Sequence, residues 1–416
     1  MTAPLLLAYI NAALLLQFAV GIGVWLWRRR SLALSASLAL PAAAAQISSS
    51  AWQGWRRFRV ARREFEDRAR TQCSFYLEPL DGVALSPFRP GQFLTFSLQA
   101  VDGGAAAPGG QRRVTRCYSL SDRPEPSRYR VTVKRVAAPA DRPDLPPGAS
   151  SSHFHDQVRD GDVLEVKAPS GHFFIDPDPS VPAVLVAGGI GITPMMSMLS
   201  WCLAEQPART VHLYYGLRSG DEHAFKQALE QSAKTHPNFH LNVIYSRPGP
   251  DDVQGRDYQH AGHVDAELLR RALPHGRHQF YVCGPAAMMQ SLVPALADWG
   301  VPRQDIHFEA FGPASVRFED AEPKPAGARL GANVEVRFHR AGRTLAWDGL
   351  NANLLEFAER HGVAVDSGCR SGSCGACEAR LVSGTVAYTH PPDHDVAPGH
   401  CLLCVGTPAS ALVIEA

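Results

Sequence analysis

The sequence lacks an excess of charge of either sign, because its 416 residues include 41 Lys and Arg against 40 Asp and Glu. Proteins that bind nucleic acids through their overall charge are strongly basic, so we expect no nucleic-acid partner. A regular framework of paired cysteines is also lacking, although the chain contains nine Cys. Thiols that stay unpaired need a reducing compartment, which predicts the cytosol for the folded domains.

The chain also lacks the side-chain sets of two common catalytic mechanisms. It contains neither a pair of carboxylates spaced for acid-base catalysis nor a Ser, His and Asp set for nucleophilic attack. No such set therefore competes for a catalytic role with the cofactor-binding motifs that the sequence does contain. With 416 residues, the chain is long enough for three modest domains.

Near the C-terminus, four cysteines follow the spacing of a 2Fe-2S cluster site. Cys369, Cys374 and Cys377 stand in CRSGSCGAC, and Cys404 follows in CLLCVG. This is the plant-type CxxxxCxxC spacing with a distant fourth cysteine. The residues between the first three cysteines are small, so the backbone can turn tightly and direct N–H groups at sulfur. A structural zinc site would instead have two tight CxxC pairs.

Cys401 is the alternative to Cys404 as the fourth ligand. Residues 399–404 resemble the GxxxxC run that closes ferredoxin clusters, which favours Cys404. The remaining thiols, Cys73, Cys117 and Cys202, are expected to be ordinary packing residues.

The N-terminus contains the longest uncharged stretch. Residues 4–27 hold no charged side chain, are long enough to cross roughly 30 Å of hydrocarbon, and are followed by three arginines. We expect a membrane anchor here, with the catalytic domains in the cytoplasm because positive charge stays inside. A cleaved signal peptide is the alternative. Residues 31–47 are either a second dip into the bilayer or a linker, and residues 52–63 either lie on anionic headgroups or lead into a first strand.

Residues 61–174 alternate short apolar runs with turns, which predicts an antiparallel β-barrel. Within it, Arg116, Tyr118 and Ser119 form an RxYS motif. A bound flavin needs a cation for its phosphates, an aromatic face against its ring and a hydroxyl near its N5 atom, and these side chains supply them in that order.

A second short motif follows in the same region. Gly148 and Ser151 fit GxxS. The N–H groups of Ser151 and Ser152 would lie at a helix start, where the helix dipole favours a pyrophosphate. Lys134 either adds charge to this site or is a solvated strand residue.

From residue 182 the pattern changes to strand, glycine loop and helix. The loop GGIGITP follows the apolar run AVLVA, and its candidate cofactor-binding residues are Gly188, Gly189, Gly191, Thr193 and Pro194. A second strand, QFYVC, leads into Cys283, Gly284 and Pro285. Further strand-helix units lie between them, which predicts a doubly wound parallel sheet with its ligand at the carboxyl ends of the strands.

Together these motifs resemble the ferredoxin-NADP reductase superfamily. The order of flavin, nucleotide and ferredoxin domains resembles its phthalate dioxygenase reductase and hybrid-cluster-protein reductase group. The resemblance implies FAD, with FMN as the alternative, and NADH or NADPH, with Arg218 at the adenosine end. In the CGP motif it places Cys283 beside the nicotinamide, and Glu309 and Phe311 resemble residues that complete the flavin pocket. We therefore expect catalytic roles for Tyr118, Ser119, Cys283 and Glu309.

The predicted architecture is multidomain. It comprises a membrane anchor and linker (1–50), an antiparallel β-barrel for the flavin (56–178), an α/β doubly wound nucleotide domain (181–312), a linker (313–332) and an α+β β-grasp ferredoxin domain (333–416). The insert around residues 137–147 and the anchor are additions to the pattern of the group that the chain resembles.

The expected function is that of a membrane-anchored NAD(P)H-dependent reductase. Electrons would pass from NADH through FAD and the 2Fe-2S cluster to an acceptor protein, namely an oxygenase, desaturase, hydroxylase or hybrid-cluster protein. The alternative is a redox-sensing or scaffolding membrane protein that keeps the reductase fold without turnover. Intact GGIGITP and CGP motifs favour the reductase.

Overall fold

The computed structural model describes residues 52, 54–101, 111–138, 146–311, 334–349, 351–370, 372, 374–389, 392, 394 and 396–416. The chain from Trp52 to Ala416 is one compact unit. Its described residues form a barrel, a parallel-sheet domain and a C-terminal domain, and each of these has a buried core of its own. The predicted linker at residues 313–332 lies outside the described residues.

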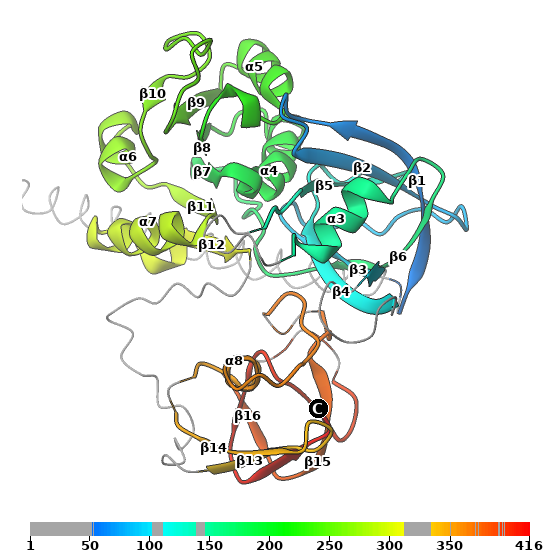
Figure 1. Cartoon of the computed structure of the whole chain (residues 1–416). Helices are drawn as coiled ribbons and strands as arrows, with labels where there is room; N and C mark the ends of the chain where they lie inside the picture. Colours follow the sequence, from blue (N-terminus) through cyan, green and yellow to red (C-terminus); the bar gives the residue numbers. More distant parts are fainter. Residues whose placement is uncertain are drawn as a thin grey trace, which may run out of the picture. The chain divides into compact units, whose positions relative to one another are not determined.

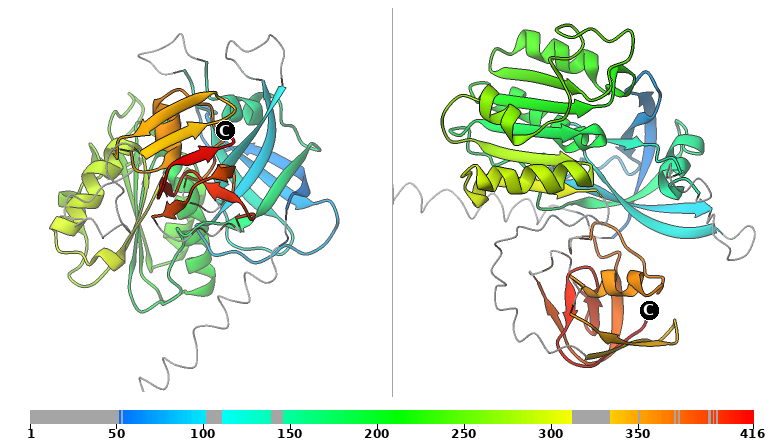
Figure 2. Two further views of the ribbon diagram at one scale, coloured as in Figure 1. Left: turned by 90° about the horizontal axis from the view of Figure 1, so that it is seen from below. Right: turned by 60° about the vertical axis from the view of Figure 1, so that its left-hand side comes forward.

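The barrel is a six-stranded antiparallel sheet with the order β4-β3-β6-β1-β2-β5 (Figure 1). Its elements are β1 (Arg56–Phe65), β2 (Gln72–Pro79), β3 (Phe93–Val101), β4 (Gln111–Ser119), β5 (Tyr129–Lys134), α3 (Ala149–Asp156) and β6 (Val163–Ser170). An antiparallel bridge between Leu120 and Val131 joins the two edges of the sheet. This closure leaves the β3–β4 hairpin projecting from the barrel (Figure 2).

The barrel encloses an aromatic core that α3 covers. Phe154 of α3 packs on Phe75 and Phe96, with ring centroids 5.0 and 5.4 Å apart respectively. Trp52 precedes β1 and packs on its Phe58 at 5.7 Å, and inward and outward residues alternate along β1 as a half-buried strand requires. Residues 52–63 had two interpretations, and in the structure this segment leads into the first strand.

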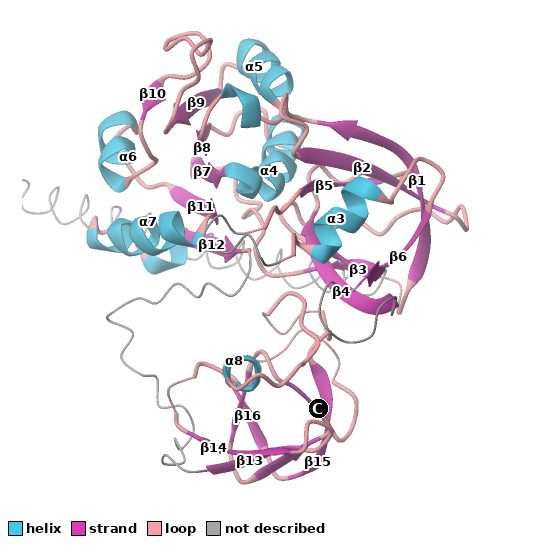
Figure 3. Cartoon of the chain, in the orientation of Figure 1, coloured by secondary structure: helices cyan, strands magenta, loops and turns pink. Residues whose placement is uncertain are grey.

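The parallel-sheet domain has the strand order β10-β9-β8-β7-β11-β12, and every neighbouring pair is parallel (Figure 3). Its strands are β7 (Ala183–Gly188), β8 (Val211–Leu217), β9 (Phe239–Tyr245), β10 (His260–Ala261), β11 (Gln279–Gly284) and β12 (Ile306–Ala310). Its helices are α4 (Ile192–Glu205), α5 (Lys226–Thr235), α6 (Ala266–Ala272) and α7 (Ala286–Asp298), with short turns η1 (Gly189–Gly191), η2 (Gly220–Glu222) and η3 (Arg303–Asp305).

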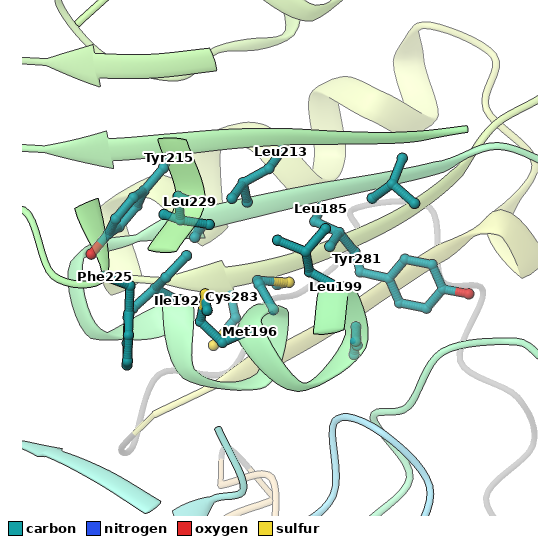
Figure 4. Close-up of a cluster of buried hydrophobic side chains, with 14 of the residues drawn as sticks. Leu185, Ile192, Met196, Leu199, Leu213, Tyr215, Phe225, Leu229, Tyr281 and Cys283 are labelled. Atoms are coloured by element: carbon teal, nitrogen blue, oxygen red, sulfur yellow. The ribbon is translucent and has the colours of Figure 1, made fainter. Parts of the chain in front are cut away.

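Helices cover both faces of this sheet. On one face, Met196 and Leu199 of α4 meet Leu185 and Cys283 of the strands (Figure 4). On the other face, residues of α6 and α7 pack against Val184 and the other buried side chains that β7 and β11 present to that face. Because both faces are buried, the strands read as continuous apolar runs such as AVLVA.

The C-terminal domain has a five-stranded sheet with the order β14-β13-β19-β15-β17 and a separate pair, β16-β18. Its elements are β13 (Val334–Phe338), β14 (Arg343–Trp347), α8 (Leu354–Arg360), β15 (Glu378–Ser383), β16 (Val386–Tyr388), β17 (His400–Leu402), β18 (Gly406–Pro408) and β19 (Leu412–Ile414). Asn353 caps α8 by accepting a hydrogen bond from the N–H of Glu356. The core of this domain contains Cys377, Cys401 and Cys404.

The predicted transmembrane helix and single-pass membrane localisation need correction. In the part of the chain that the structure describes, no helix combines the length and the apolarity that a bilayer crossing needs. The 14 residues of α4 reach only about 21 Å at about 1.5 Å per residue, short of the roughly 30 Å of hydrocarbon. Residues 4–27 and 31–47, to which the expectation applied, lie outside the described residues.

Main-chain hydrogen bonds join the barrel to the parallel-sheet domain. The N–H of Ala69 donates to the carbonyl of Asp221 at 2.9 Å, and the N–H of Phe225 donates to the carbonyl of Glu66 at 3.2 Å. Lys134 of β5 adds an ion pair of 2.8 Å with Glu222. The turn between β1 and β2 is therefore tied to η2 and the residues after it.

Candidate active site

The RxYS motif lies at the end of β4, where alternate side chains point to opposite sides of the strand. The Tyr118 hydroxyl is 2.8 Å from Oγ of Ser150 in α3, and the Tyr118 ring meets Phe154 edge-on at 5.0 Å. Burial raises the pKa of Tyr118 to about 12, so its phenol stays neutral. Tyr118 is thus held rigidly as an aromatic wall between β4 and α3.

Ser119 is buried and faces a carboxyl group from another domain. Neither Oγ of Ser119 nor Oε2 of Glu309 has a hydrogen-bonding partner among the described residues. Glu309 lies on β12, where it is the registered partner of Cys283 on β11. Burial raises the pKa of Glu309 to about 8.

The first turn of α3 presents further polar groups. Oγ of Ser151 donates to the carbonyl of Gly148 at 2.9 Å and accepts from the N–H of Val136 at 3.1 Å. Oγ of Ser152 is buried without a partner in the described structure. Unpartnered buried oxygens are costly unless something binds them, so Ser119, Ser152 and Glu309 fit a polar ligand such as a flavin nucleotide.

Arg116 and Lys134, the candidate cations for the flavin phosphates, contact protein groups, and their role toward a flavin stays a prediction. Arg116 is exposed, and its guanidinium donates to the carbonyls of Thr115 at 2.8 Å and Ser367 at 3.3 Å. Lys134 is paired with Glu222, so its charge is already matched. The structure brings Tyr118, Ser119 and the α3 start together, whereas Arg116 reaches toward the C-terminal domain.

The two predicted nucleotide loops follow neighbouring strands and touch each other. A Cβ atom on Gly191 would lie 2.1 Å from the carbonyl oxygen of Cys283, and one on Gly188 would lie 2.5 Å from Cδ of Pro285. Only glycine allows this close approach of backbone to backbone. Gly284 completes the contact, with Gly188 only 3.0 Å from its added Cβ.

The remaining residues of the glycine loop begin α4. Gly189 has a φ of +53°, in the left-handed region that favours glycine. Oγ1 of Thr193 donates to the carbonyl of Ile190 at 3.0 Å, and Pro194 lies buried in the first turn of α4. The loop therefore stands at the carboxyl ends of β7 and β11, the usual position of a ligand in such a sheet.

Cys283 and Arg218 have contrasting surroundings. Cys283 is fully buried, and burial raises its pKa well above the usual value, so its thiol is neutral. Arg218 keeps 73% of its side chain exposed, and its nearest ion-pair oxygen, on Glu222, is 3.5 Å away. Arg218 is therefore accessible to solvent, and its contact with the adenosine end of a nucleotide stays a prediction. Phe311 is exposed as well.

The four predicted cluster ligands form two pairs. The N–H of Cys374 donates to the sulfur of Cys369 at 3.3 Å, and the N–H of Cys369 donates to the sulfur of Cys374 at 3.2 Å. The N–H of Cys404 donates to the sulfur of Cys377 at 3.4 Å. Two thiol pairs suit two iron atoms, and no group of three such ligands for a single metal ion occurs in the described residues.

Cys404 and Cys401, the two candidates for the fourth cluster ligand, have different surroundings. The Cys404 thiol hydrogen-bonds the Cys377 sulfur, which lowers the pKa of Cys377 and raises that of Cys404. Cys401 lies on β17 within the apolar core, where burial raises its pKa to about 12. Cys404 is thus the sulfur paired with a motif cysteine.

Sequence reasoning missed two residues that touch the cluster loop. Cys117, expected to be a packing residue, has its Sγ 3.6 Å from the position of a Cβ added to Gly368, and Nζ of Lys167 in β6 donates to the carbonyl of Cys374 at 3.2 Å. Cys117 occupies the variable position of RxYS, which was the one available signal. Lys167 lies 207 positions from Cys374, and no local pattern links the two.

Comparisons with known proteins match both halves of this arrangement. The family described as Oxidoreductase NAD-binding domain matches residues 185–293, and the family described as 2Fe-2S iron-sulfur cluster binding domain matches residues 341–409. A flavohemoprotein of Halalkalibacterium halodurans is 39% identical over 268 residues, which are 64% of this chain and 63% of that protein. The chain thus spans less than two thirds of the length of this curated relative.

Two solved structures share the fold. The FAD/NAD-binding domain of a nitric oxide dioxygenase from Vibrio cholerae is 32% identical, with a TM-score of 0.53, and the match covers 63% of this chain and 100% of that one. Phthalate dioxygenase reductase, described as modular for electron transfer from pyridine nucleotides to [2Fe-2S], is 28% identical, with a TM-score of 0.51. That match covers 87% of this chain and 98% of the reductase.

Proposed function

Because the chain belongs to the ferredoxin-NADP reductase superfamily of NAD(P)H-dependent oxidoreductases and carries a C-terminal 2Fe-2S domain, we propose that it is an electron-transfer reductase. It passes electrons from NADH, through FAD and the cluster, to an oxygenase component. The family membership confirms the expected cofactors, namely FAD, a nicotinamide nucleotide and a 2Fe-2S cluster. A desaturase, a hydroxylase and a hybrid-cluster protein remain the other acceptors.

The observation that carries this proposal is the meeting of groups from all the folded regions. The barrel is hydrogen-bonded to the parallel-sheet domain through the main chain of Ala69 and Phe225, and Lys167 of the barrel donates to the carbonyl of Cys374 in the cluster loop at 3.2 Å. A chain that only bound its cofactors separately would not need this convergence. Electron transfer between a flavin and a cluster does need the two sites to be adjacent.

The chain's own residues supply positioning and exclusion of water. When bound, a nicotinamide supplies a hydride, a flavin converts electron pairs into single electrons, and a 2Fe-2S cluster carries single electrons. The glycine loop and the CGP loop let a nucleotide approach the backbone, while Cys283 gives this site a neutral, buried wall. Tyr118 gives the barrel side an aromatic wall, and Ser119 and Glu309 offer a donor and an acceptor to a bound ring.

The proposed acceptor rests on the resemblance in domain order. This chain covers nearly the whole length of phthalate dioxygenase reductase, which is described as a modular structure for electron transfer from pyridine nucleotides to [2Fe-2S]. The flavohemoprotein of Halalkalibacterium halodurans matches over 268 residues, 64% of this chain, whereas the family described as 2Fe-2S iron-sulfur cluster binding domain matches residues 341–409. The C-terminal domain therefore favours a separate acceptor protein that receives single electrons.

The test compares two artificial acceptors with full-length protein purified without oxygen. We expect NADH-driven reduction of ferricyanide, which accepts electrons directly from a flavin, and of cytochrome c, which takes single electrons from the cluster. The variant Cys404→Ser should keep the ferricyanide rate and lose most of the cytochrome c rate, and Cys401→Ser should keep both. Protein that contains FAD and iron but oxidises no NADH would instead support the sensing or scaffolding alternative.

A further inference from the structure

We propose that Glu222 makes the nucleotide site select NADH over NADPH, and that Lys134 of the barrel limits the strength of this selection. Glu222 is a specificity-determining residue that acts on Arg218, the arginine at the exposed edge of the site. This inference rests on the proposed function, because it takes a nicotinamide nucleotide as the electron donor and Arg218 as a residue at its adenosine end.

Arg218 stands where a doubly wound sheet distinguishes the two nucleotides. It directly follows β8, which pairs in parallel with β7, and β7 leads into the glycine loop. In such folds an acidic residue beyond the glycine loop binds the ribose 2′-hydroxyl of NAD, whereas an arginine nearby accommodates the 2′-phosphate of NADP. Here both residue types are present, because Glu222 lies four positions after Arg218. Their contacts therefore decide which nucleotide the site favours.

The Glu222 carboxylate lies between two cations from different domains. Its Oε1 atom is 3.5 Å from a guanidinium nitrogen of Arg218, and its Oε2 atom is 2.8 Å from Nζ of Lys134 on β5. The Arg218 side chain is 73% exposed, whereas the Glu222 side chain is only 20% exposed. The carboxylate is thus the enclosed member of the Arg218 pair, and the guanidinium is the member that a ligand from solvent meets first.

Contacts with the barrel hold Glu222 in place. Its carbonyl accepts a hydrogen bond of 3.0 Å from Nε2 of Gln72, a fully buried residue of β2. The carbonyl of the preceding residue, Asp221, accepts from the N–H of Ala69 at 2.9 Å. Because its main chain is bonded to the barrel and its side chain to Lys134, the carboxylate stays beside Arg218 when a ligand approaches.

The charges then favour one nucleotide. A 2′-phosphate that binds Arg218 must displace the Glu222 carboxylate from the guanidinium and lie close to it, and two negative groups at such a separation repel each other. A 2′-hydroxyl is uncharged and escapes this repulsion. Lys134 offsets part of the Glu222 charge, so it weakens the repulsion without removing it.

The first test measures the ratio of the kcat/KM values for NADPH and NADH, with ferricyanide as the acceptor and full-length protein. Glu222→Gln keeps the shape of the side chain and removes its charge, and it should raise the ratio about tenfold. Lys134→Gln leaves the Glu222 charge unopposed, and it should lower the ratio about threefold. A general loosening of the junction between the domains would not move the ratio in opposite directions.

The second test measures binding without turnover. Calorimetric titration with adenosine 2′-monophosphate, which carries the 2′-phosphate and lacks a nicotinamide, should give a Kd about tenfold lower for Glu222→Gln than for the wild type. The double variant Arg218→Ala with Glu222→Gln should lose most of this gain, because the carboxylate acts by competing for Arg218. A gain that survives intact in the double variant would contradict this route.

Asp221→Asn is the matched control, because Asp221 is the neighbouring carboxylate of η2 and its ion pair goes to Arg68 at 2.6 Å. It should leave the kinetic ratio and the Kd for adenosine 2′-monophosphate within about twofold of the wild type, since an exposed charge is screened by solvent. Equal changes for Asp221→Asn and Glu222→Gln, or no change for Glu222→Gln, would overturn the inference. Wild-type protein that oxidises neither nucleotide overturns the proposed function instead, and the binding titration still tests Glu222.

Discussion

The parallel-sheet domain and the C-terminal domain both present loops of small residues to a cofactor, but they need those residues for different reasons. In the glycine loop, Gly191 leaves room for the carbonyl of Cys283, which presses against it. In the cluster loop, Arg370, Gly372 and Gly375 have φ values of 58°, 80° and 72°, so the backbone turns N–H groups inward to the sulfurs. Similar composition thus serves close packing in one loop and sharp turning in the other.

The cores of the two domains also differ, because only one of them contains predicted cofactor ligands. The parallel sheet has apolar clusters on both faces, formed by side chains of the domain together with Phe173 and Ile175 of the segment before it. The single core of the C-terminal domain includes Cys377 and Cys404, which are predicted to bind iron. We infer that the first domain is complete without its ligand, whereas the second depends on its cluster for stability.

The strongest test of this contrast is removal of the cluster. Cys404→Ser should lower the melting temperature of the C-terminal domain by about 20 °C, because loss of a structural metal site costs several kcal/mol and each kcal/mol shifts a domain of this size by about 4–8 °C. Calorimetry with iron analysis would measure it, and the transition of the parallel-sheet domain should not move. Cys401→Ser is the control, with full iron and a smaller shift. Equal shifts in the two domains would contradict the contrast.

The next test uses two glycines of the same loop. Gly191→Ala should cost about 3 kcal/mol of unfolding free energy, because its methyl group overlaps the main chain of Cys283. Gly189→Ala should cost only about 1 kcal/mol, from its left-handed φ, since no described atom lies within 4 Å of the added carbon. Denaturant unfolding gives both values. The Michaelis constant for NADH should also rise for Gly191→Ala. Similar losses of unfolding free energy at both positions would show that close packing is not the reason for glycine at position 191.

A third test asks where acid sensitivity lies. Burial, with smaller contributions from His240 and His278, lowers the pKa of His212 on β8 to about 4. An unfolded histidine titrates near 6.5, so between pH 6.5 and 4 the unfolded state binds the extra proton and stability falls as the pH falls. His212→Phe should remove about 2 kcal/mol of the stability lost between pH 7 and 4.5. Unfolding at both pH values measures it, and an unchanged pH dependence would contradict the assignment to His212.

The smallest effect concerns the exposed edge of the nucleotide site. Arg218→Ala should leave the melting temperature unchanged, because most of the side chain is in solvent and its ion pair is long. The Michaelis constant should rise by about threefold to tenfold. A much larger rise for NADPH than for NADH would indicate contact with a 2′-phosphate, and equal small rises would favour stacking on adenine. No change with either nucleotide would remove Arg218 from the site.

The parts of the site that the sequence predicted are those with a local spacing. The cluster cysteines, GGIGITP, CGP and RxYS each lie within a few residues of one turn, where backbone geometry dictates which residue types fit. The hydrogen bond from Lys167 to the carbonyl of Cys374 has no such signature, because it depends on how two separate sheets meet. Lys134 illustrates the same limit, since its charge is matched by Glu222, 88 positions away.

The membrane prediction is corrected on the described helices, none of which combines the length and the apolarity of a bilayer crossing. Hydropathy is a property of a single segment and carries no information on tertiary contacts. The barrel and the parallel sheet were accessible to sequence reasoning because alternation and continuous apolar runs distinguish half-buried from fully buried strands. Residue-level docking between domains, by contrast, is decided by tertiary contacts.

The ties between the turn after β1 and the residues around η2 have a consequence for turnover. They are largely amide-to-carbonyl bonds, which added salt hardly weakens, and Lys134 reinforces them. Barrel and parallel sheet should therefore behave as a single stiff frame without a hinge. Spent coenzyme would then leave by small side-chain shifts instead of a wide swing, and we expect its departure to be nearly indifferent to solvent viscosity.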